Sequence, residues 1–176
     1  MEGESTLSKK KEKVYKIVLL GDESVGKTST ITQHVEKKFE ESYKMTIGTD
    51  ISAKLMEEGG KNIYLIIWDI GGQDKFKVLR ESYLQGAFGA LVLYDISNQF
   101  SYNHIPDWIA DAEKYCGKIP LILCGNKNDL ENKRVILAED GKKLAKEIGA
   151  EFIETSAKTG ENVDEAFNLL VQKIVK

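Results

Sequence analysis

Short apolar runs separated by amphipathic segments are the dominant pattern along the chain. Residues 17–20, 90–94 and 121–124 are almost continuously apolar, which is typical of strands that are buried on both faces of a sheet. Segments with helical spacing of apolar residues lie between these runs. Strands that alternate with helices predict a parallel sheet with helices on both faces, so we expect an α/β domain.

One part of the chain breaks this alternation. Residues 50–55 alternate apolar and polar side chains, which predicts a half-exposed edge strand. They lead through Glu58 and two glycines into the apolar run 62–68. We therefore expect an antiparallel hairpin that forms one edge of the sheet.

Apolar side chains at helical spacing predict the helices. Asn162 and Glu165 are three residues apart and predict a capping box at the start of the last helix. Residues 144–149 carry a Leu–Ile pair four residues apart and end in glycine, which predicts a helix end. Pro106 lies inside an expected helix and should kink it or delay its start. The apolar stripe of the last helix comprises Val163, Phe167, Leu170 and Ile174.

Composition restricts the classes of function. The chain has 176 residues with 25 basic and 28 acidic side chains, so we expect one domain that binds no nucleic acid. Its two cysteines, Cys116 and Cys124, lack metal-ligand spacing and favour a reducing, cytoplasmic location. No apolar stretch approaches the roughly 20 residues needed to span a bilayer.

The two ends of the chain carry no lipidation signal. Glycine stands at position 3 rather than 2, and the last residues include no cysteine, so we expect no lipid anchor. Residues 1–13 are polar and include a lysine cluster. We expect a flexible tail there, and a docking patch is the alternative.

The most specific motif is GDESVGKT at residues 21–28, which matches G-x-x-x-x-G-K-[ST] directly after the apolar run 14–20. A strand that ends in such a loop and opens into a helix aims several backbone N–H groups at one point, which binds a polyphosphate. Lys27 would reach the β- and γ-phosphates, and the Thr28 hydroxyl would ligate Mg²⁺. The alternative is a glycine-containing surface turn. The candidate phosphate-binding residues are Glu23, Ser24, Val25, Gly26, Lys27, Thr28 and Ser29.

A second constellation, WDIGGQD at residues 68–74, follows an apolar run. Asp69 could hold Mg²⁺ through a water molecule, and the backbone N–H of Gly72 could approach a terminal phosphate. Gln73 could orient a water molecule for in-line attack, so Gln73 and Lys27 are the candidate catalytic residues. Taken alone, this segment equally fits a turn that ends a strand.

The polar loop 39–48 lies between these two motifs. Thr46 could supply a second hydroxyl to Mg²⁺, and Phe39 could stack against a base. Tyr43 is a further candidate contact to the nucleotide. A solvated loop with one anchoring aromatic residue is the alternative.

A third motif, NKND at residues 126–129, follows a buried strand at the sheet edge where nucleotides bind in open α/β folds. The Asp129 carboxylate can accept two N–H bonds from guanine. Adenine would leave this carboxylate unpaired, which supports discrimination of roughly 10⁴-fold. The Lys127 stem would cover the base, and Asn126 would tie the loop to the phosphate region. Taken alone, this tetrapeptide is also a common turn.

The segment ETSAK at residues 154–158 would complete the base pocket. The Ala157 backbone N–H would face the guanine carbonyl oxygen, and Ser156 and Lys158 are the neighbouring candidates. With these motifs in this order, the chain resembles the small GTPases of the Ras superfamily from about residue 14 to residue 174. It is most similar to the Rab branch.

This resemblance implies a three-layer P-loop NTPase fold over residues 14–176. The expected sheet has six mostly parallel strands with one antiparallel edge strand, and about five helices cover it. The family implies a monomeric switch that binds Mg²⁺ with GTP or GDP and hydrolyses GTP slowly. Segments 39–48 and 70–83 would be the two switch segments, which contact effectors, exchange factors and activating proteins. Membrane trafficking or signalling would be the regulated process.

Three features depart from the Rab pattern. Residues 69–74 read DIGGQD where Rab proteins usually carry Asp-Thr-Ala-Gly-Gln-Glu, and this version is closer to the Arf branch. The prenylated terminal cysteines of Rab proteins are missing. Glu23 stands in the phosphate loop, where its side chain would crowd an arginine from an activating protein.

Two other functions remain open at this point. A GTP-binding interaction module with negligible hydrolysis would use the same pocket and differ only in the hydrolytic step. A P-loop kinase would need an arginine-rich lid, but the only arginines are Arg80 and Arg134. We expect both arginines to lie away from the site, so intrinsic hydrolysis should be slow.

Overall fold

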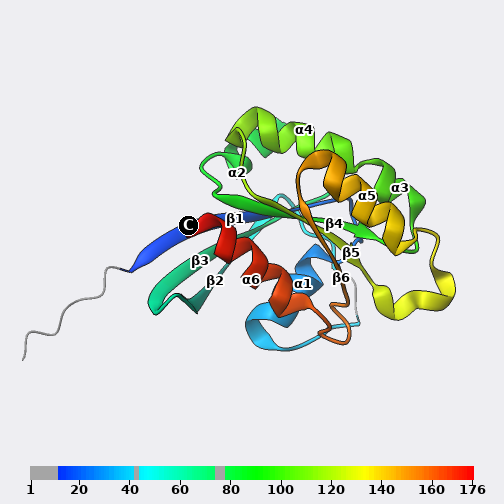
Figure 1. Ribbon diagram of the computed structural model, residues 1–176, viewed down its shortest axis with the longest axis horizontal. Helices are drawn as coiled ribbons and strands as arrows, with labels where there is room; N and C mark the ends of the chain where they lie inside the picture. Colours follow the sequence, from blue (N-terminus) through cyan, green and yellow to red (C-terminus); the bar gives the residue numbers. More distant parts are fainter. Residues whose placement is uncertain (1–11, 42–43, 74–77) are drawn as a thin grey trace, which may run out of the picture.

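A six-stranded sheet forms the middle layer of the protein. The computed structural model describes residues 12–41, 44–73 and 78–176, and its strands pair in the order β2-β3-β1-β4-β5-β6. Helices cover both faces of this sheet (Figure 1), so the expected three-layer α/β fold is confirmed. The strands are β1 (Lys13–Leu20), β2 (Thr49–Glu58), β3 (Lys61–Ile70), β4 (Gly89–Asp95), β5 (Leu121–Asn126) and β6 (Glu151–Thr155).

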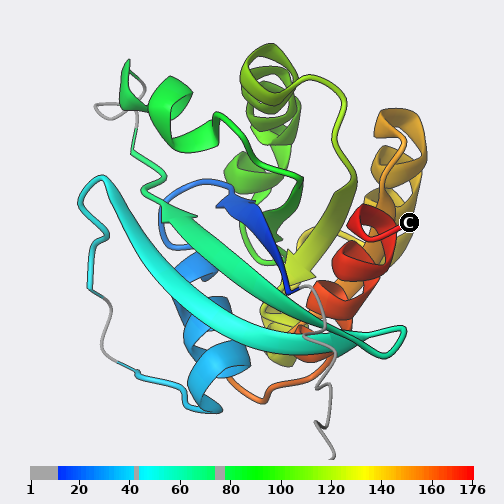
Figure 2. The same ribbon diagram turned by 90° about the vertical axis from the view of Figure 1, so that its left-hand side faces the viewer.

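The edge hairpin is present as predicted. β2 and β3 pair antiparallel from Thr49 opposite Ile70 to Glu58 opposite Lys61, whereas all other neighbouring strands are parallel. Along β2, exposed and half-buried residues alternate from Asp50 onward in most of the strand, as expected for an edge. Figure 2 shows the hairpin crossing in front of the other strands.

Two hydrophobic cores separate the three layers. Side chains of β1 alternate between them, with Ile17 and Leu19 on one face and Val18 and Leu20 on the other. Helices α1 and α6 pack on the first face, and α2, α4 and α5 pack on the second. The helices are α1 (Lys27–Glu36), α2 (Arg80–Leu84), α3 (Gln99–Asn103), α4 (Ile105–Cys116), α5 (Ala138–Ile148) and α6 (Val163–Ile174), with a 3₁₀ segment η2 (Asn128–Lys133).

Pro106 accounts for the difference between the expected number of helices, about five, and the six α-helices of the described residues. A short helix, α3, ends before His104, and α4 starts at Ile105 with the proline in its first turn. Proline has no N–H to donate and is tolerated only in a first turn. The predicted break is therefore found at this residue.

The predicted capping box of α6 is wrong. Asn162 is the N-cap residue, but its backbone is left-handed at φ 55° and its side chain caps no N–H of the helix. Its amide instead donates to the carbonyl oxygen of Glu154 at 2.9 Å. A tertiary contact to the end of β6 therefore replaces the local cap. By contrast, Gly149 ends α5 in the left-handed conformation, as expected.

Most of the expected tail lies outside the described residues, and β1 already begins at Lys13. No helix in the described part of the chain is long and apolar enough to cross a membrane. The carboxyl ends of the parallel strands β1, β3, β4, β5 and β6 point to one edge of the sheet, where ligands bind in open α/β folds.

Candidate functional site

The loop between β1 and α1 turns tightly around one point at this edge of the sheet. Two glycines make the turn possible. Gly21 has φ +139°, and a Cβ atom there would lie 2.3 Å from the carbonyl oxygen of Leu93. Gly26 has φ +101°, and a Cβ atom there would lie 2.4 Å from Asn126 Nδ2. Any larger residue at either position would clash, so the motif glycines are required by the backbone.

Lys27 points into this loop and is only 6% exposed. Its Nζ donates to the carbonyl oxygens of Gly21 and Asp22 at 2.6 and 2.7 Å. Burial lowers the pKa of Lys27 to about 8, although the nearby Asp69 carboxylate acts in the opposite direction. An anion bound in the loop would favour the charged form of this lysine. The loop is therefore suited to a phosphate group.

The three predicted magnesium ligands lie together. The hydroxyls of Thr28 and Thr46 are 2.9 Å apart, and both donate to Asp69 Oδ2, with a distance of 3.3 Å from Thr46. Burial raises the pKa of Asp69, and its buried Oδ1 has no hydrogen-bond partner among the described residues.

This donor set fits Mg²⁺ rather than a transition metal. Two hydroxyls and one carboxylate are oxygen ligands, and they leave coordination positions for water and phosphate oxygens, as Mg²⁺ prefers. No group of three or more His, Cys, Asp or Glu side chains suitable for a metal occurs in the described part of the chain.

Residues 71–73, at the start of the expected second switch segment, pack directly on the loop 21–28. A Cβ atom on Gly72 would lie 2.3 Å from the backbone nitrogen of Glu23, so only glycine permits this approach. Gln73 follows at the same cavity. Its amide donates to the sulfur atom of Met45 in the first switch segment. The expected first and second switch segments are thus in contact beside residues 21–28.

Asn126 ties the base-recognition loop to the phosphate loop. It is completely buried, and its Nδ2 donates to the carbonyl oxygen of Val25 at 2.8 Å. Its Oδ1 accepts from Thr155 Oγ1 and from the backbone N–H of Ala157, at 3.0 and 3.2 Å. Asn126 therefore links the two loops. The Ala157 N–H, which was expected to face a guanine carbonyl oxygen, donates to Asn126 in this structure.

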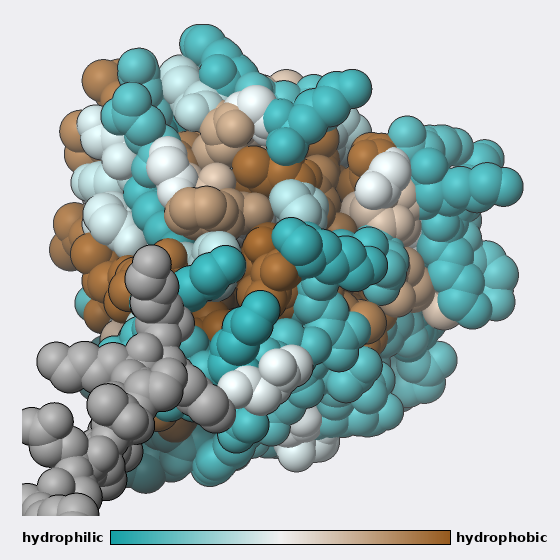
Figure 3. Space-filling model, turned by 60° about the vertical axis from the view of Figure 1, so that its left-hand side comes forward, coloured by the Kyte–Doolittle hydropathy of each residue, from teal (hydrophilic) through white to brown (hydrophobic). Residues whose placement is uncertain are grey.

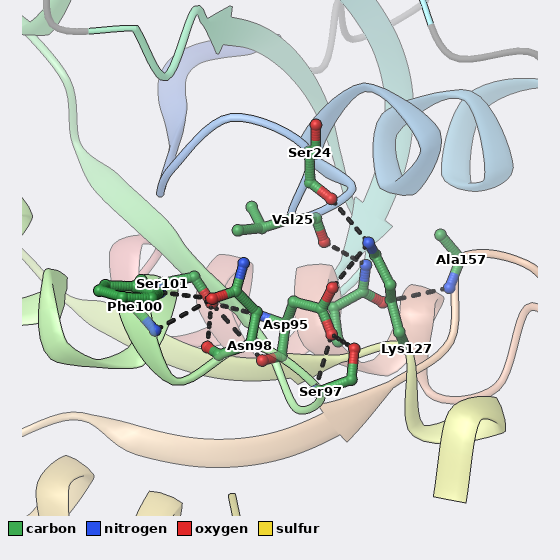
Figure 4. A network of polar contacts seen from close by, with 10 residues as sticks. Ser24, Val25, Asp95, Ser97, Asn98, Phe100, Ser101, Lys127 and Ala157 are labelled. Atoms are coloured by element: carbon green, nitrogen blue, oxygen red, sulfur yellow. Dashed lines mark hydrogen bonds and ion pairs between the residues drawn. The ribbon is translucent and has the colours of Figure 1, made fainter. Parts of the chain in front are cut away.

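Lys127 and Asp129 are also fixed by neighbouring groups. The Lys127 ammonium bridges the Asp95 carboxylate and the carbonyl oxygen of Ser24, each at 2.7 Å (Figure 4). Asp129 Oδ1 accepts from the Ser156 hydroxyl at 2.6 Å. These contacts hold the lysine stem and the acidic side chain at the cavity, where a base would bind.

All these elements border one cavity of about 360 Å³, a volume in the usual range for small-molecule sites. Neither arginine of the core lines it. Arg80 pairs with Asp111 at 2.7 Å, and Arg134 pairs with Glu154 at 2.6 Å. Both arginines are engaged outside the cavity, as expected.

Comparison with known proteins agrees with this geometry. The profile described as Ras family matches residues 16–176. The chain belongs to the Ras family of small GTPases. It is 40% identical over 162 residues to the Ras-related protein RIC1 of Oryza sativa subsp. japonica, with 92% of this chain and 80% of that protein covered. It is 41% identical over 170 residues to the Ras-related protein Rab-13 of Mesocricetus auratus, with 96% of this chain and 84% of that protein covered.

These relatives are Rab-type, so the small GTPase described here is a Rab-like guanine-nucleotide switch protein. Family membership also removes the kinase alternative. The Arf-like segment at residues 69–74 is thus a local departure within a Rab-like chain.

The structure brings most of the predicted site residues of this GTPase to the cavity. Three predicted residues do not line the cavity but form hydrogen bonds with residues that do: Val25, Asp69 and Ser156. Tyr43 lies outside the described residues. The predicted residues that line the cavity are Glu23, Ser24, Gly26, Lys27, Thr28, Ser29, Phe39, Thr46, Gly72, Gln73, Asn126, Lys127, Asp129, Ala157 and Lys158.

Sequence reasoning missed several lining residues of this GTPase. Their only signal was proximity in sequence to a motif, since no motif assigns a ligand contact to their positions. They are Thr32, Glu40, Glu41, Lys44, Met45, Gly71 and Leu130.

Proposed function

We propose that this GTPase binds GTP and GDP together with Mg²⁺ and slowly hydrolyses GTP to GDP and phosphate. The observation that carries the proposal is the convergence of three groups on one cavity. These are the phosphate loop with Lys27, the oxygen cluster around Asp69, and the base-recognition loop with Asp129. Each group suits a different part of a guanine nucleotide.

The phosphates would bind to the backbone N–H groups of residues 21–28 and to Lys27. Thr28 and Thr46 would ligate Mg²⁺ through their hydroxyls, and Asp69 would hold it through a water molecule. When bound, Mg²⁺ neutralises charge that develops on the phosphate oxygens during transfer. Lys27 contributes a further positive charge at the same position.

Gln73 would orient the attacking water molecule. Its amide offers both a donor and an acceptor, which suits a water molecule that must be aligned and not deprotonated beforehand. The contact with Met45 holds this side chain at the first switch segment.

The intrinsic reaction should be slow because no arginine of the described core lines the cavity. An arginine supplied by a partner typically accelerates such reactions by roughly 10³–10⁵-fold. Glu23 also lines the cavity, so an incoming guanidinium group would meet its carboxylate there. Activating proteins must accommodate this side chain.

The two switch segments supply the surface for effectors, exchange factors and activating proteins. They expose apolar side chains, namely Met45, Ile47, Val78 and Leu79. Figure 3 shows apolar areas set among hydrophilic ones on one face of the molecule. Exposed apolar side chains that gather on one surface often mark contact sites for partner proteins. By analogy with Rab-type relatives, we assign the switch to the control of membrane trafficking from the cytoplasm.

A GTP-binding module with negligible hydrolysis is the second candidate. The acidic side chain of Glu23 at the cavity favours it, since this side chain would hinder an arginine from an activating protein. The two candidates share nucleotide binding and differ only in turnover.

One experiment tests both candidates. Nucleotide released from the purified protein is identified by mass spectrometry, and a single-turnover time course then follows bound GTP. GDP or GTP in the released fraction, followed by slow formation of GDP, supports the switch. Bound GTP without turnover supports the interaction module. Release of ATP, or of no nucleotide, contradicts both.

A further inference from the structure

The side chain of Asp22 turns away from the cavity and contacts helix α4. Trp108 Nε1 donates to Asp22 Oδ1 at 2.8 Å, and His104 Nδ1 lies 2.6 Å from Asp22 Oδ2. Because a carboxylate only accepts hydrogen bonds, His104 must donate from Nδ1. Both oxygens of one phosphate-loop residue are thus held by the N-cap residue of α4, His104, and by Trp108 in the first turns of this helix.

The backbone of Asp22, in contrast, lies within the site. Its carbonyl oxygen accepts from Lys27 Nζ at 2.7 Å. A Cβ atom on Gly72 would lie 2.4 Å from the carbonyl carbon of Asp22, so the second switch segment packs on the same peptide group. A shift of the Asp22 side chain would therefore displace a group that contacts both the phosphate lysine and the switch.

Trp108 links this anchor to the second switch segment by its ring face. The Arg80 guanidinium group of α2 lies 3.9 Å from the centre of the Trp108 ring, and Arg80 Nη1 pairs with Asp111 at 2.7 Å. Trp108 itself is only 3% exposed. The buried side chain of Trp108 therefore connects helix α4 to both the phosphate loop and α2.

The loop needs such an anchor because its backbone is strained. Ser24 has φ 65°, a left-handed conformation that non-glycine residues rarely adopt. Conformations of this kind persist only where the surroundings enforce them. Lys127 donates to the carbonyl oxygen of Ser24 itself. Two residues earlier in the loop, the Asp22 side chain is held by His104 and Trp108.

We propose that Asp22, Trp108 and His104 are positioning residues that keep the phosphate loop in its binding shape and thereby slow nucleotide release. The inference rests on the proposed function, since the released ligand is a guanine nucleotide. A loop that already has its binding conformation loses less conformational entropy when the nucleotide binds, so preorganisation of the loop increases affinity. Hydrogen bonds to a charged group are stronger than neutral ones, which makes this contact suitable for the purpose.

The test measures dissociation of a fluorescent N-methylanthraniloyl GDP from the full chain with Mg²⁺ present. Asp22→Ala and Trp108→Phe should each raise the dissociation rate about tenfold. Because both remove the same hydrogen bond, the double variant should be no faster than Asp22→Ala alone. Asp22→Asn keeps an acceptor for the indole and should restore a rate near that of the unchanged protein. Asp107→Ala, an exposed residue of the same helix, is the matched control.

A second measurement needs no nucleotide. Hydrogen exchange of residues 21–28 in the nucleotide-free protein should be faster in Asp22→Ala and unchanged in Asp107→Ala. Unchanged dissociation rates in Asp22→Ala, or additive effects in the double variant, would overturn the positioning role. A protein that binds no GDP would instead overturn the proposed function, and hydrogen exchange would still decide whether α4 orders the loop.

Discussion

Individual side chains of the site have different expected roles, and Gln73 is expected to affect GTP hydrolysis but not nucleotide binding. Gln73→Leu keeps the size of the side chain and removes the amide that would orient water. We expect single-turnover GTP hydrolysis to slow by about tenfold or more, with GDP affinity nearly unchanged. Gln85→Leu, an exposed glutamine at the end of α2, is the control. Equal hydrolysis rates in the two variants would reject the role of Gln73.

Asp129 is the residue that should select the base. Guanine offers two N–H donors to a carboxylate, whereas xanthine replaces the exocyclic amine by a carbonyl oxygen. Asp129→Asn supplies a donor for that oxygen, so we expect the preference to move from guanine toward xanthine nucleotides. Competition of GDP and XDP against a fluorescent nucleotide measures this change. Continued strict preference for guanine in the variant would contradict the assigned pairing.

The lowered pKa of Lys27 predicts that nucleotide binding takes up a proton. Lys27 has a pKa of about 8 in the free protein, and a bound phosphate should raise it. At pH 8.5 most of the lysine is neutral before binding, so we expect uptake of roughly 0.8 proton and weaker binding as pH rises further. Calorimetry of GDP binding in buffers of different ionisation enthalpy measures the uptake. At pH 6.5 the lysine is already protonated and should contribute no uptake.

At the scale of elements, a polar cluster around the buried His34 joins α1 and β2 to α6. His34 is 1% exposed, and its Nδ1 lies 2.7 Å from Asp164 Oδ1. Lys54 of β2 donates to the backbone carbonyl of His34. Burial lowers the pKa of His34 to about 4, so its neutral ring donates to Asp164 at neutral pH.

Asp164→Ala should therefore destabilise the fold without touching the nucleotide site. The buried Nδ1–H of His34 would lose its acceptor, which costs about 1–3 kcal/mol in free energy of unfolding. Urea unfolding followed by circular dichroism measures the loss. Glu165→Ala, an exposed neighbour on α6, should lower the free energy of unfolding by less than about 0.5 kcal/mol. Equal stability of both variants would show that the cluster contributes nothing.

Features that depend on neighbouring residues in the chain were predictable from the sequence. Features that depend on contacts between residues far apart in the chain were not. The strands at 17–20 and 121–124 and the break at Pro106 follow from apolar runs and from the missing N–H of proline. The cap of α6 was predicted wrongly because Asn162 bonds to β6, a partner that the local pattern does not show.

The candidate site shows the same division. The glycines and Lys27 could be placed because one short motif contains their geometry. The bond between Asp22 and Trp108 joins residues 86 positions apart, and no spacing rule predicts it. Likewise Thr32 and Leu130 line the cavity only because the fold places α1 and η2 at the border of the same cavity.

At the scale of the whole molecule, the cavity lies between segments that are far apart in the chain. Residues 21–28 form one wall, and residues 126–129 form another. Within the protein, the side chain of Asn126 bridges these walls. A nucleotide that contacts both walls should therefore stabilise the entire fold, because unfolding either wall would require its release.

Thermal unfolding with Mg²⁺ and GDP measures this effect directly. At a ligand concentration about 1,000 times the dissociation constant, binding adds about 4 kcal/mol of stability. For a chain of this length that corresponds to a rise in Tm of roughly 8–16 °C. Mg²⁺ with ADP is the control and should raise Tm far less, since the Asp129 carboxylate finds no pair of donors on adenine. Chelation of Mg²⁺ by EDTA should reverse much of the rise with GDP, because Thr28, Thr46 and Asp69 would lose the cation that joins them to the phosphates. An equal rise with ADP would contradict base selection by Asp129, and an unchanged Tm with GDP would contradict a site that joins the two walls.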